Sequence, residues 1–230
     1  MASIESSRNF WNEKAKENPI WYVSSYGPYH GRDEADFWRS GSAIWEQIKG
    51  KIGYLPASKD VVVEVGSGVG RLSRVISSEV GTLYGTDISA EMLELARAHN
   101  IANGEFSLGD GASLRQFGNG SADLVLGYCV FQHLPSIDIL RGYLQEMCRV
   151  AKPGGLIAFT LVPHDWWSWL EPLAAMKNRL FPADGPKGIH TKEWRGIRPT
   201  RNEVEKLSPI PLKFTFTGSG QWLFYGRVGS

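Results

Sequence analysis

The stretch that decides the fold is Val61-Val62-Val63-Glu64-Val65-Gly66-Ser67-Gly68-Val69-Gly70. Its first half is rich in β-branched residues, which favour a buried strand. Its second half places glycine at every other position, where a backbone can turn sharply and approach a ligand. Apolar residues then recur at helical spacing from Leu72 to Val80, and Gly81 closes this segment. We therefore expect a strand, a ligand-binding turn and a helix.

The chain downstream alternates between apolar runs and helical segments. Further strands are expected over residues 82–86, 105–108, 123–128 and 156–161, with Ser89 and Ser136 as helix N-caps. Strands joined by helices pair in parallel through right-handed crossovers. The sequence therefore predicts an α/β fold with a doubly wound sheet.

The end of the chain has a different pattern. Thr200-Arg201-Asn202-Glu203 is a capping box that opens a short helix. Two strand-like runs, 212–217 and 221–227, then flank Gly218-Ser219-Gly220. Glycine between two such runs is typical of a hairpin, so we expect the sheet to finish with an antiparallel pair.

Composition narrows the class of protein. The 230 residues carry a formal charge of +1, which gives no electrostatic reason to expect a nucleic-acid partner. Two cysteines, Cys129 and Cys148, exclude a disulfide-rich scaffold and a four-cysteine zinc site. Residues 1–8 lack the apolar core of a signal peptide, and no window reaches the roughly 18 apolar residues of a membrane span. We expect a soluble, cytoplasmic protein with no membrane insertion.

Two aspartates follow successive strands. Asp87 lies about 20 residues beyond the glycine turn, where a carboxylate can accept both ribose hydroxyls. Asp110 follows the next strand, where a carboxylate can accept an adenine amino group; each aspartate alone could also simply cap a loop. Arg71 stands where a dinucleotide-binding fingerprint needs a small residue, which disfavours NAD. The pattern favours an adenosine without phosphates.

These residues resemble the motifs of class I S-adenosylmethionine-dependent methyltransferases. Glu64 to Gly70 is similar to the E/D-x-G-x-G-x-G motif of that family, and later motifs match in order at Tyr84–Ser89, Gly109–Gly111, Ala122–Val125, His133–Pro135 and Lys152–Gly155. The resemblance covers about residues 58–162. It implies a seven-stranded, mostly parallel Rossmann-like sheet, S-adenosyl-L-methionine as cofactor and S-adenosyl-L-homocysteine as product.

The resemblance also implies a role for individual residues. Asp87 would bind the ribose, Asp110 the adenine amine, and Ile88 would pack on the adenine ring. The glycine turn would line the methionine moiety, and two residues after the fourth strand would border the sulfonium. The full set of expected cofactor-binding residues is Glu64, Gly66, Ser67, Gly68, Asp87, Ile88, Asp110, Gly111, Ala112, Tyr128 and Cys129.

Methyl transfer to a hydroxyl benefits from a general base, typically worth about 10²–10⁴-fold in rate. His133, just past the fourth strand, is the first candidate, although the His-Leu-Pro turn could merely open the next helix. His164, followed by Asp165 just past the fifth strand, is the second candidate, with a simple turn as its alternative. His190 is a third. Clustered carboxylates are missing at these strand ends, so no metal is expected.

Two segments are expected to determine which substrate binds. The aromatic residues 1–57 form a helical cap that could fold over the donor, and residues 163–199 form a lid-like insert. In the insert, Trp166 and Trp167 would pack a ring-bearing acceptor, while Arg195 and Arg198 would bind its carboxylate or phosphate; the alternative is a solvated basic face. With the donor-binding core at 58–162 and a terminal helix and strand pair at 200–230, the chain would form one domain over 1–230.

These observations favour an enzyme that methylates a small molecule. O-methylation of a glycan, lipid or secondary metabolite, with an anionic acceptor as one option, is the first hypothesis. N- or C-methylation remains open because the donor half of the site is the same for all three. An RNA or protein methyltransferase and a non-catalytic adenosyl-ligand-binding protein remain open as well. Against nucleic-acid amino methylation, the Asn-Pro-Pro-Tyr-like turn of those enzymes is replaced here by Gly127-Tyr128-Cys129-Val130.

Overall fold

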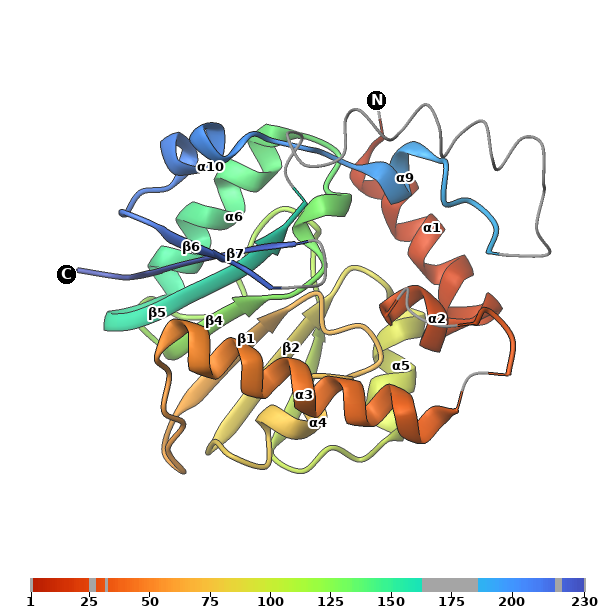
Figure 1. Cartoon of the computed structure of the whole chain (residues 1–230), viewed down its shortest axis with the longest axis horizontal. Helices are drawn as coiled ribbons and strands as arrows, with labels where there is room; N and C mark the ends of the chain where they lie inside the picture. Colours follow the sequence, from red (N-terminus) through yellow and green to blue (C-terminus); the bar gives the residue numbers. More distant parts are fainter. Residues whose placement is uncertain (1, 25–27, 32, 163–185, 218–220, 230) are drawn as a thin grey trace.

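A seven-stranded sheet forms the centre of the molecule (Figure 1). The computed structural model describes residues 2–24, 28–31, 33–162, 186–217 and 221–229. The strand order is β3-β2-β1-β4-β5-β7-β6. Strands β1 to β5 pair in parallel, while β7 runs antiparallel to both β5 and β6. The strands are β1 Val61–Val65, β2 Thr82–Asp87, β3 Gly104–Leu108, β4 Ala122–Gly127, β5 Ala151–Leu161, β6 Lys213–Phe216 and β7 Trp222–Arg227.

Helices cover both faces of this sheet. Figure 1 shows α3 and α4 on one face and α6 and α10 on the other. The helices are α1 Ile4–Glu17, α2 Pro19–Ser24, α3 Glu34–Ile52, α4 Ser73–Ile76, α5 Ala90–Ala98, the 3₁₀ turn η1 Phe131–His133, α6 Ile137–Val150, α9 Lys192–Arg195 and α10 Arg201–Leu207. None of the helices in the described ranges is long and apolar enough to span a membrane.

Each face of the sheet has its own apolar core. Trp45 of α3 and Ile76 of α4 are fully buried against Leu124 on one face. Leu144 of α6 and Val204 of α10 are fully buried in the core of the other face. Burial of β4 on both faces explains why its sequence is continuously apolar rather than alternating.

The doubly wound, seven-stranded architecture predicted from the sequence is confirmed. The predicted N-caps are also present, because the side chains of Ser89, Ser136 and Thr200 each accept a hydrogen bond from a backbone N–H three residues on. The predicted antiparallel ending is formed by β6 and β7, although the turn at 218–220 lies outside the described residues.

The helix after β1 is much shorter than its sequence pattern predicts. Helical spacing continues to Val80, but α4 ends at Ile76. The Ser77 hydroxyl donates to the carbonyl oxygen of Arg74, and the Ser78 hydroxyl donates to that of Val75. Serine side chains that bond nearby carbonyls compete with the helical ladder, and here two consecutive serines do so.

Strand β5 begins earlier than predicted, at Ala151 rather than Leu156. Ala151 pairs with Ala122 before the register shifts between Ala122 and Leu124. The Lys-Pro-Gly-Gly sequence at 152–155 is therefore an irregularity within the strand, not a connection before it.

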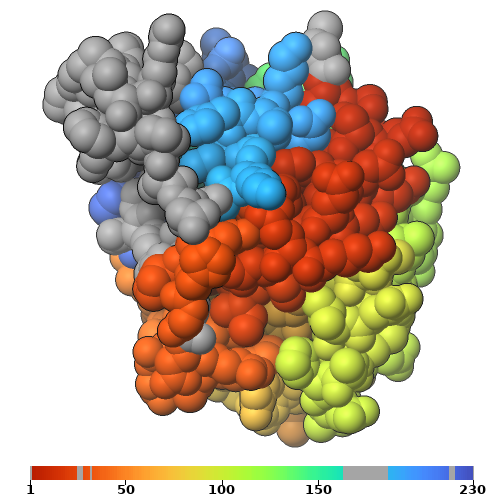
Figure 2. Space-filling view, turned by 90° about the vertical axis from the view of Figure 1, so that its right-hand side faces the viewer, coloured from red at the N-terminus to blue at the C-terminus, as the bar shows by residue number. Residues whose placement is uncertain are grey.

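The N-terminal helices lie across the end of the sheet where the parallel strands terminate. Helix α1 contacts α2, α5 and α9. Figure 2 shows residues 186 onward, in light blue, packed beside the red N-terminal segment. A hydrogen bond of 2.9 Å from the Tyr22 hydroxyl to the Lys187 carbonyl oxygen joins the two segments. The end of the insert and the N-terminal cap therefore form one cover.

Candidate ligand-binding site

A pocket opens at the carboxyl ends of β1, β2 and β4, beneath α1 and α2. This is the switch point of the sheet, because β1 connects to β2 on one side and lies beside β4 on the other. Ligands of open α/β sheets bind in that crevice. Trp11 of α1 and Tyr22 of α2 line the pocket from the side of the cap.

The glycine turn forms the floor of the pocket. Gly66 and Gly68 have φ angles of 70° and 54°, a region that favours glycine. A Cβ atom on Gly66 would lie 2.5 Å from Cγ2 of Val130. The backbone N–H groups of Gly66 and Ser67 donate to the Thr86 carbonyl oxygen at 2.7 and 3.1 Å, which holds the turn against β2.

Asp87 ends β2 and points back to the glycine turn. Its Oδ2 accepts from the N–H of Gly68 and its Oδ1 from the N–H of Ser89, both at 2.9 Å. Burial raises the pKa of Asp87, while these N–H groups oppose the rise. A carboxylate has about four acceptor sites, so Asp87 retains capacity for the two hydroxyls of a ribose.

An apolar slot lies beyond Asp87. Ile88, Gly111 and Ile4 line it, and a Cβ atom on Gly111 would lie 2.7 Å from Cδ1 of Ile88 and 2.8 Å from Cγ2 of Ile4. Gly111 has a φ of 84°. These distances place Gly111 in close contact with both isoleucines, and the three residues give this part of the pocket an apolar lining.

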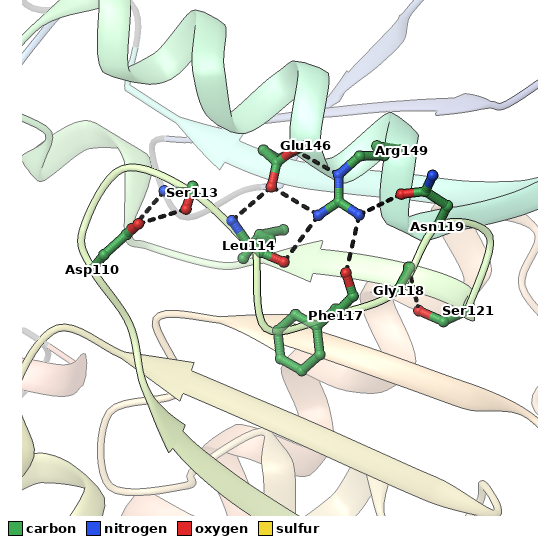
Figure 3. Close-up of polar contacts among 9 residues, drawn as sticks. All are labelled: Asp110, Ser113, Leu114, Phe117, Gly118, Asn119, Ser121, Glu146 and Arg149. Atoms are coloured by element: carbon green, nitrogen blue, oxygen red, sulfur yellow. Dashed lines mark hydrogen bonds and ion pairs between the residues drawn. The ribbon is translucent and has the colours of Figure 1, made fainter.

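Asp110 is exposed and does not line the described pocket. Its Oδ1 accepts from the N–H of Ala112 at 2.8 Å. Ser113 donates to Oδ1 through its N–H at 2.7 Å and to Oδ2 through its hydroxyl (Figure 3). These bonds hold the pKa of Asp110 below its ordinary value although burial opposes them. The carboxylate expected to bind an adenine amine therefore shapes the loop that carries Gly111.

Helix α6 fixes the same loop from the other side. The Arg149 guanidinium donates to the carbonyl oxygens of Leu114 and Phe117, both at 3.0 Å (Figure 3). Glu146 pairs with Arg149 at 2.7 Å and accepts from the Leu114 N–H at 3.0 Å. The loop that carries Gly111 is thus anchored to the rigid part of the fold.

Glu64 is buried in β1 beneath the turn, with 3% of its surface exposed. The Ser73 hydroxyl donates to its Oε2 at 2.5 Å. Burial raises the pKa of Glu64 to about 8, against the opposing effects of Ser73 and Arg71. Glu64 therefore carries a proton for much of the time near neutral pH.

His133 also lines the pocket and lies in the turn past the end of β4. Its Nδ1 lies 2.5 Å from the carbonyl oxygen of Trp194 in α9. A carbonyl only accepts, so Nδ1 carries the proton and Nε2 has the lone pair. Gln132 approaches that Nε2 at 3.3 Å. Burial lowers the pKa of His133 to about 4, with a smaller lowering by Arg198, so the ring is neutral at physiological pH.

Tyr128 and Cys129 follow β4 and line the pocket. Cys129 has a φ of 59°, which is unusual for a residue with a side chain. Its N–H donates to the Thr160 hydroxyl at 2.8 Å, and its Sγ accepts from Gln221 at 3.0 Å. Strained backbone held by its neighbours is a frequent feature of functional sites.

The two arginines that were expected to bind the substrate do not line this pocket. Arg195 is exposed at the end of α9, and Arg198 is half-buried nearby; neither lines the pocket. His164, Trp166 and Trp167 lie outside the described residues. His190 is exposed. Among the described residues, no group of three or more His, Cys, Asp and Glu side chains is arranged to hold a metal ion.

Sequence reasoning missed three contributors to this site. Trp194 holds His133, and Trp11 packs against the His133 ring with ring centres 5.0 Å apart. Arg71 lines the pocket, although its sequence position served only to disfavour NAD. The clustering of tryptophans in the two flanking segments is the one signal that pointed toward Trp11 and Trp194.

The fold and the pocket define a Rossmann-like protein with the sheet of class I methyltransferases. Residues 63–159 match the family model described as a methyltransferase domain. The middle of the chain is therefore similar to a methyltransferase domain, and the sheet around it has the class I arrangement.

Two curated relatives match part of the chain. An arsenite methyltransferase of Aquipseudomonas alcaligenes is 36% identical over 118 residues, which cover 45% of this chain and 33% of that protein. A ubiquinone biosynthesis O-methyltransferase of Cronobacter sakazakii is 28% identical over 145 residues, which cover 60% of this chain and 56% of that protein. The chain thus spans about a third of the length of the first relative and about half of the length of the second.

Solved structures share the fold along nearly the whole chain. The magnesium protoporphyrin IX methyltransferase of Synechocystis PCC 6803, solved with bound SAH, has a TM-score of 0.65 at 18% identity and covers 98% of this chain and 100% of its own. The PH0226 protein of Pyrococcus horikoshii OT3 has a TM-score of 0.64 at 19% identity and covers 90% of this chain and 98% of its own. At these identities the similarity shows the fold.

Proposed function

We propose that this protein transfers a methyl group from S-adenosylmethionine to a hydroxyl group of a small molecule. The observation that carries the proposal is that one pocket is lined both by Asp87 and Ile88, where β2 ends, and by a neutral histidine, His133, past the end of β4. The methyltransferase domain at 63–159 supports the choice of donor. When bound, this donor supplies a methyl group attached to a positively charged sulfur.

The residues present fit that donor. Asp87 would accept the ribose hydroxyls, and the apolar lining formed by Ile88, Gly111 and Ile4 would contact the adenine ring. Asp110 and Ala112 would meet the edge of the ring from the loop. Gly66, Ser67, Gly68 and Glu64 would line the amino-acid portion, and Tyr128 with Cys129 would border the sulfur.

His133 would orient the acceptor and take its proton. With Nδ1 fixed on the Trp194 carbonyl, Nε2 is the nitrogen that would accept a hydrogen bond from an acceptor hydroxyl, which would take the place of the Gln132 amide that now donates to it at 3.3 Å. A base with a pKa of about 4 removes protons efficiently only from acidic hydroxyls. This favours a phenol or an enol over the alcohol of a sugar. Helices α1 and α2 would exclude water from the reacting groups.

The walls of the pocket support a ring-bearing acceptor. Trp11, Tyr22, Tyr128 and Tyr143 line it, and aromatic side chains pack well against flat apolar groups. Arg198 is close enough to His133 to lower its pKa, so an anionic group on the acceptor would find a cation near the base. Arg195, His164, Trp166 and Trp167 remain proposed contacts of the acceptor.

A matched panel of acceptors tests this proposal. Transfer of a labelled methyl group would be measured to a phenol, an aliphatic alcohol and an aromatic amine on the same ring framework. We expect transfer to the phenol in preference to the other two, with a roughly 100-fold or larger loss of kcat in His133→Asn. Transfer to the amine alone would contradict O-methylation. Donor binding without transfer to any compound in a broad panel would favour a non-catalytic adenosyl-binding protein.

A second variant tests the anionic group. Arg198→Gln should raise the KM for a carboxylated phenol and leave the KM for the uncharged parent phenol unchanged. Equal KM values for both phenols in the wild-type protein would contradict the proposal that the acceptor carries an anionic group. An equal rise in the KM for both phenols in Arg198→Gln would indicate that Arg198 stabilises the fold and does not bind the anionic group.

A further inference from the structure

Two glutamine side chains form a chain of hydrogen bonds that ends at the proposed base His133. Gln132 precedes His133 in η1, and Gln221 lies 89 residues further along, directly before β7. The Nε2 of Gln221 donates to the Oε1 of Gln132 at 3.3 Å, and the Nε2 of Gln132 lies 3.3 Å from the Nε2 of His133. The amide of Gln132 therefore lies between Gln221 and the base.

The direction of each of these hydrogen bonds follows from the state of His133. Its Nδ1 donates to the Trp194 carbonyl oxygen, so its Nε2 can only accept. Gln132 accordingly turns its NH2 group toward the ring, which leaves its Oε1 to accept from Gln221. An amide NH2 has two N–H groups, and the ring takes only one of them. Within the described part of the chain, the second N–H of Gln132 has no hydrogen-bond partner.

The Gln132 amide is held from the side away from the imidazole ring. Gln221 has 8% of its surface exposed, and its Nε2 also donates to Sγ of Cys129 at 3.0 Å. The main-chain carbonyl oxygen of Gln221 accepts from the N–H and the hydroxyl of Thr217, both at 2.9 Å. Helix α9 confines the main chain of Gln132, since a Cβ atom on Gly196 would lie 2.2 Å from its carbonyl oxygen. The amide can therefore keep its place when its bond to the ring is broken.

An acceptor hydroxyl can contact both Gln132 and His133. Their contact of 3.3 Å is at the long end of the hydrogen-bond range, so a better partner can displace it. Because the two nitrogens are this close, one oxygen can lie at a hydrogen-bond distance of about 2.9 Å from both. A hydroxyl donates one proton and has two lone pairs. It can thus donate to the Nε2 of His133 and accept from the N–H of Gln132.

The chemistry of the proposed base gives this N–H a role. Burial lowers the pKa of His133 to about 4, whereas a phenolic hydroxyl such as that of tyrosine has a pKa of about 10. Proton transfer from such a hydroxyl to the ring is therefore unfavourable without help. A hydrogen bond donated to the oxygen favours its charged form. A donor placed where negative charge develops typically raises the rate by about 10²–10³-fold.

We propose that Gln132 is a catalytic residue that donates its N–H to the acceptor oxygen, and that Gln221 is the positioning residue that holds its amide. The inference rests on the proposed function and adds a class of acceptor, the weakly acidic phenols, that depends on Gln132. The acceptor oxygen loses its proton to the Nε2 of His133 and forms a bond to the methyl carbon. The carbon–sulfur bond breaks at the same time, and its electron pair stays on the sulfur, which becomes neutral.

Two phenols that differ in acidity test the proposal. They are the parent phenol of the acceptor panel and its more acidic para-nitro derivative. Gln132→Leu removes the amide at similar size. We expect kcat for the parent phenol to fall roughly 10- to 100-fold in this variant. The kcat for the nitrophenol should fall less than about 3-fold, because the ring already spreads the charge of its oxygen. Affinity for S-adenosylhomocysteine, measured by calorimetry, should stay within about 3-fold of wild type.

The absorbance of the nitrophenol gives a readout that does not depend on turnover. Its ionised and neutral forms have different spectra, so their ratio can be measured in the complex with S-adenosylhomocysteine. At the same pH, this ratio should be roughly 10-fold higher in wild type than in Gln132→Leu, because the amide stabilises the ionised form. An equal ratio in both proteins would contradict a hydrogen bond from Gln132 to the oxygen.

Three further variants separate the amide from its support. Gln132→Glu keeps the size and an oxygen for Gln221 but has no N–H when ionised, so it should lose as much kcat as Gln132→Leu. Gln221→Leu keeps the Gln132 amide and removes its support. It should show a smaller loss that is again larger for the parent phenol than for the nitrophenol. Gln47→Leu changes an exposed glutamine of α3 and should behave as wild type does.

The possible results distinguish the inference from the proposed function. An equal loss of kcat for both phenols in Gln132→Leu would indicate a structural role, and an unchanged kcat for both would remove Gln132 from the reaction. These two results contradict only the inference. A wild-type protein that binds S-adenosylhomocysteine but methylates neither phenol would contradict the proposed function itself, and the inference with it.

Discussion

The Nδ1 atom of His133 and the carbonyl oxygen of Trp194 lie 2.5 Å apart, although 61 residues separate them in the sequence. This bond joins the turn after β4 to α9. Trp11 of α1 packs on both residues, with ring centres 5.0 Å from His133 and 5.8 Å from Trp194. Helix α1 of the cap, α9 at the end of the insert and the proposed base His133 are therefore held together by direct contacts.

Gly196 allows α9 to approach the turn that carries His133, and its replacement should move the two apart. Gly196 has a φ of 47°, and a Cβ atom there would lie 2.2 Å from the Gln132 carbonyl oxygen. Gly196→Ala should push α9 away from η1 and lengthen the bond to His133. We expect kcat to fall at least about 10-fold while S-adenosylhomocysteine affinity changes little. Wild-type activity in Gly196→Ala would contradict the role of this contact; Gly229→Ala is the control, because it also has a positive φ but no neighbour within 4 Å.

The pH dependence of the reaction follows from the pKa of His133. Because its pKa is lowered to about 4, the ring stays neutral and able to accept a proton well below pH 6.5. The acid limb of the kcat/KM profile should therefore fall near pH 4 to 5 if the protein remains folded, rather than near 6.5. An acid limb near 6.5 that persists in His133→Asn would assign the titration to a different group.

Glu64 should make stability decrease as pH rises. Its folded-state pKa of about 8 lies above its ordinary value of 4.5, so between these values the folded state holds more protons than the unfolded state. The contribution of Glu64 to the free energy of unfolding is therefore fully present below about pH 4.5. It decreases as the pH rises and is lost toward pH 8. Denaturant unfolding at several pH values should show a flatter profile for Glu64→Gln than for wild type. Parallel profiles would contradict the buried, protonated state.

Arg149 should be required for the loop that carries Gly111. Arg149→Ala removes hydrogen bonds to the carbonyl oxygens of Leu114 and Phe117 and removes the ion pair with Glu146 (Figure 3). We expect a loss of about 1–3 kcal/mol in the free energy of unfolding and weaker binding of adenosine ligands. Arg141→Ala is the control, since it breaks an exposed pair with Asp138, which should cost less than about 1 kcal/mol. Similar losses in both variants would contradict the anchoring role.

The core of the fold was predictable because its signals are local. The run of valines before Gly66 and the caps at Ser89 and Ser136 depend on residues within a few positions. The short α4 was not predictable from apolar spacing, because Ser77 and Ser78 end it through bonds that the spacing does not encode.

The site was predictable where it follows the strands and not where distant segments meet. Asp87, Ile88 and Gly111 lie in or beside the pocket because strand ends position them. Trp194 and Trp11 meet His133 only through the folding of the insert end onto the N-terminal cap, which no short-range pattern specifies. Arg71 has an unambiguous place in the sequence, but its long hydrogen bonds and the lack of a described carboxylate beside it appear only in three dimensions.

Calorimetric titration with S-adenosylhomocysteine, with NADH as comparator, addresses the donor site itself. We expect micromolar binding of S-adenosylhomocysteine to wild type, no binding of NADH, and a roughly 10- to 100-fold loss in Asp87→Ala, whose folding would be checked by circular dichroism. Binding of NADH without S-adenosylhomocysteine, or equal affinity in wild type and Asp87→Ala, would contradict a donor site built on Asp87.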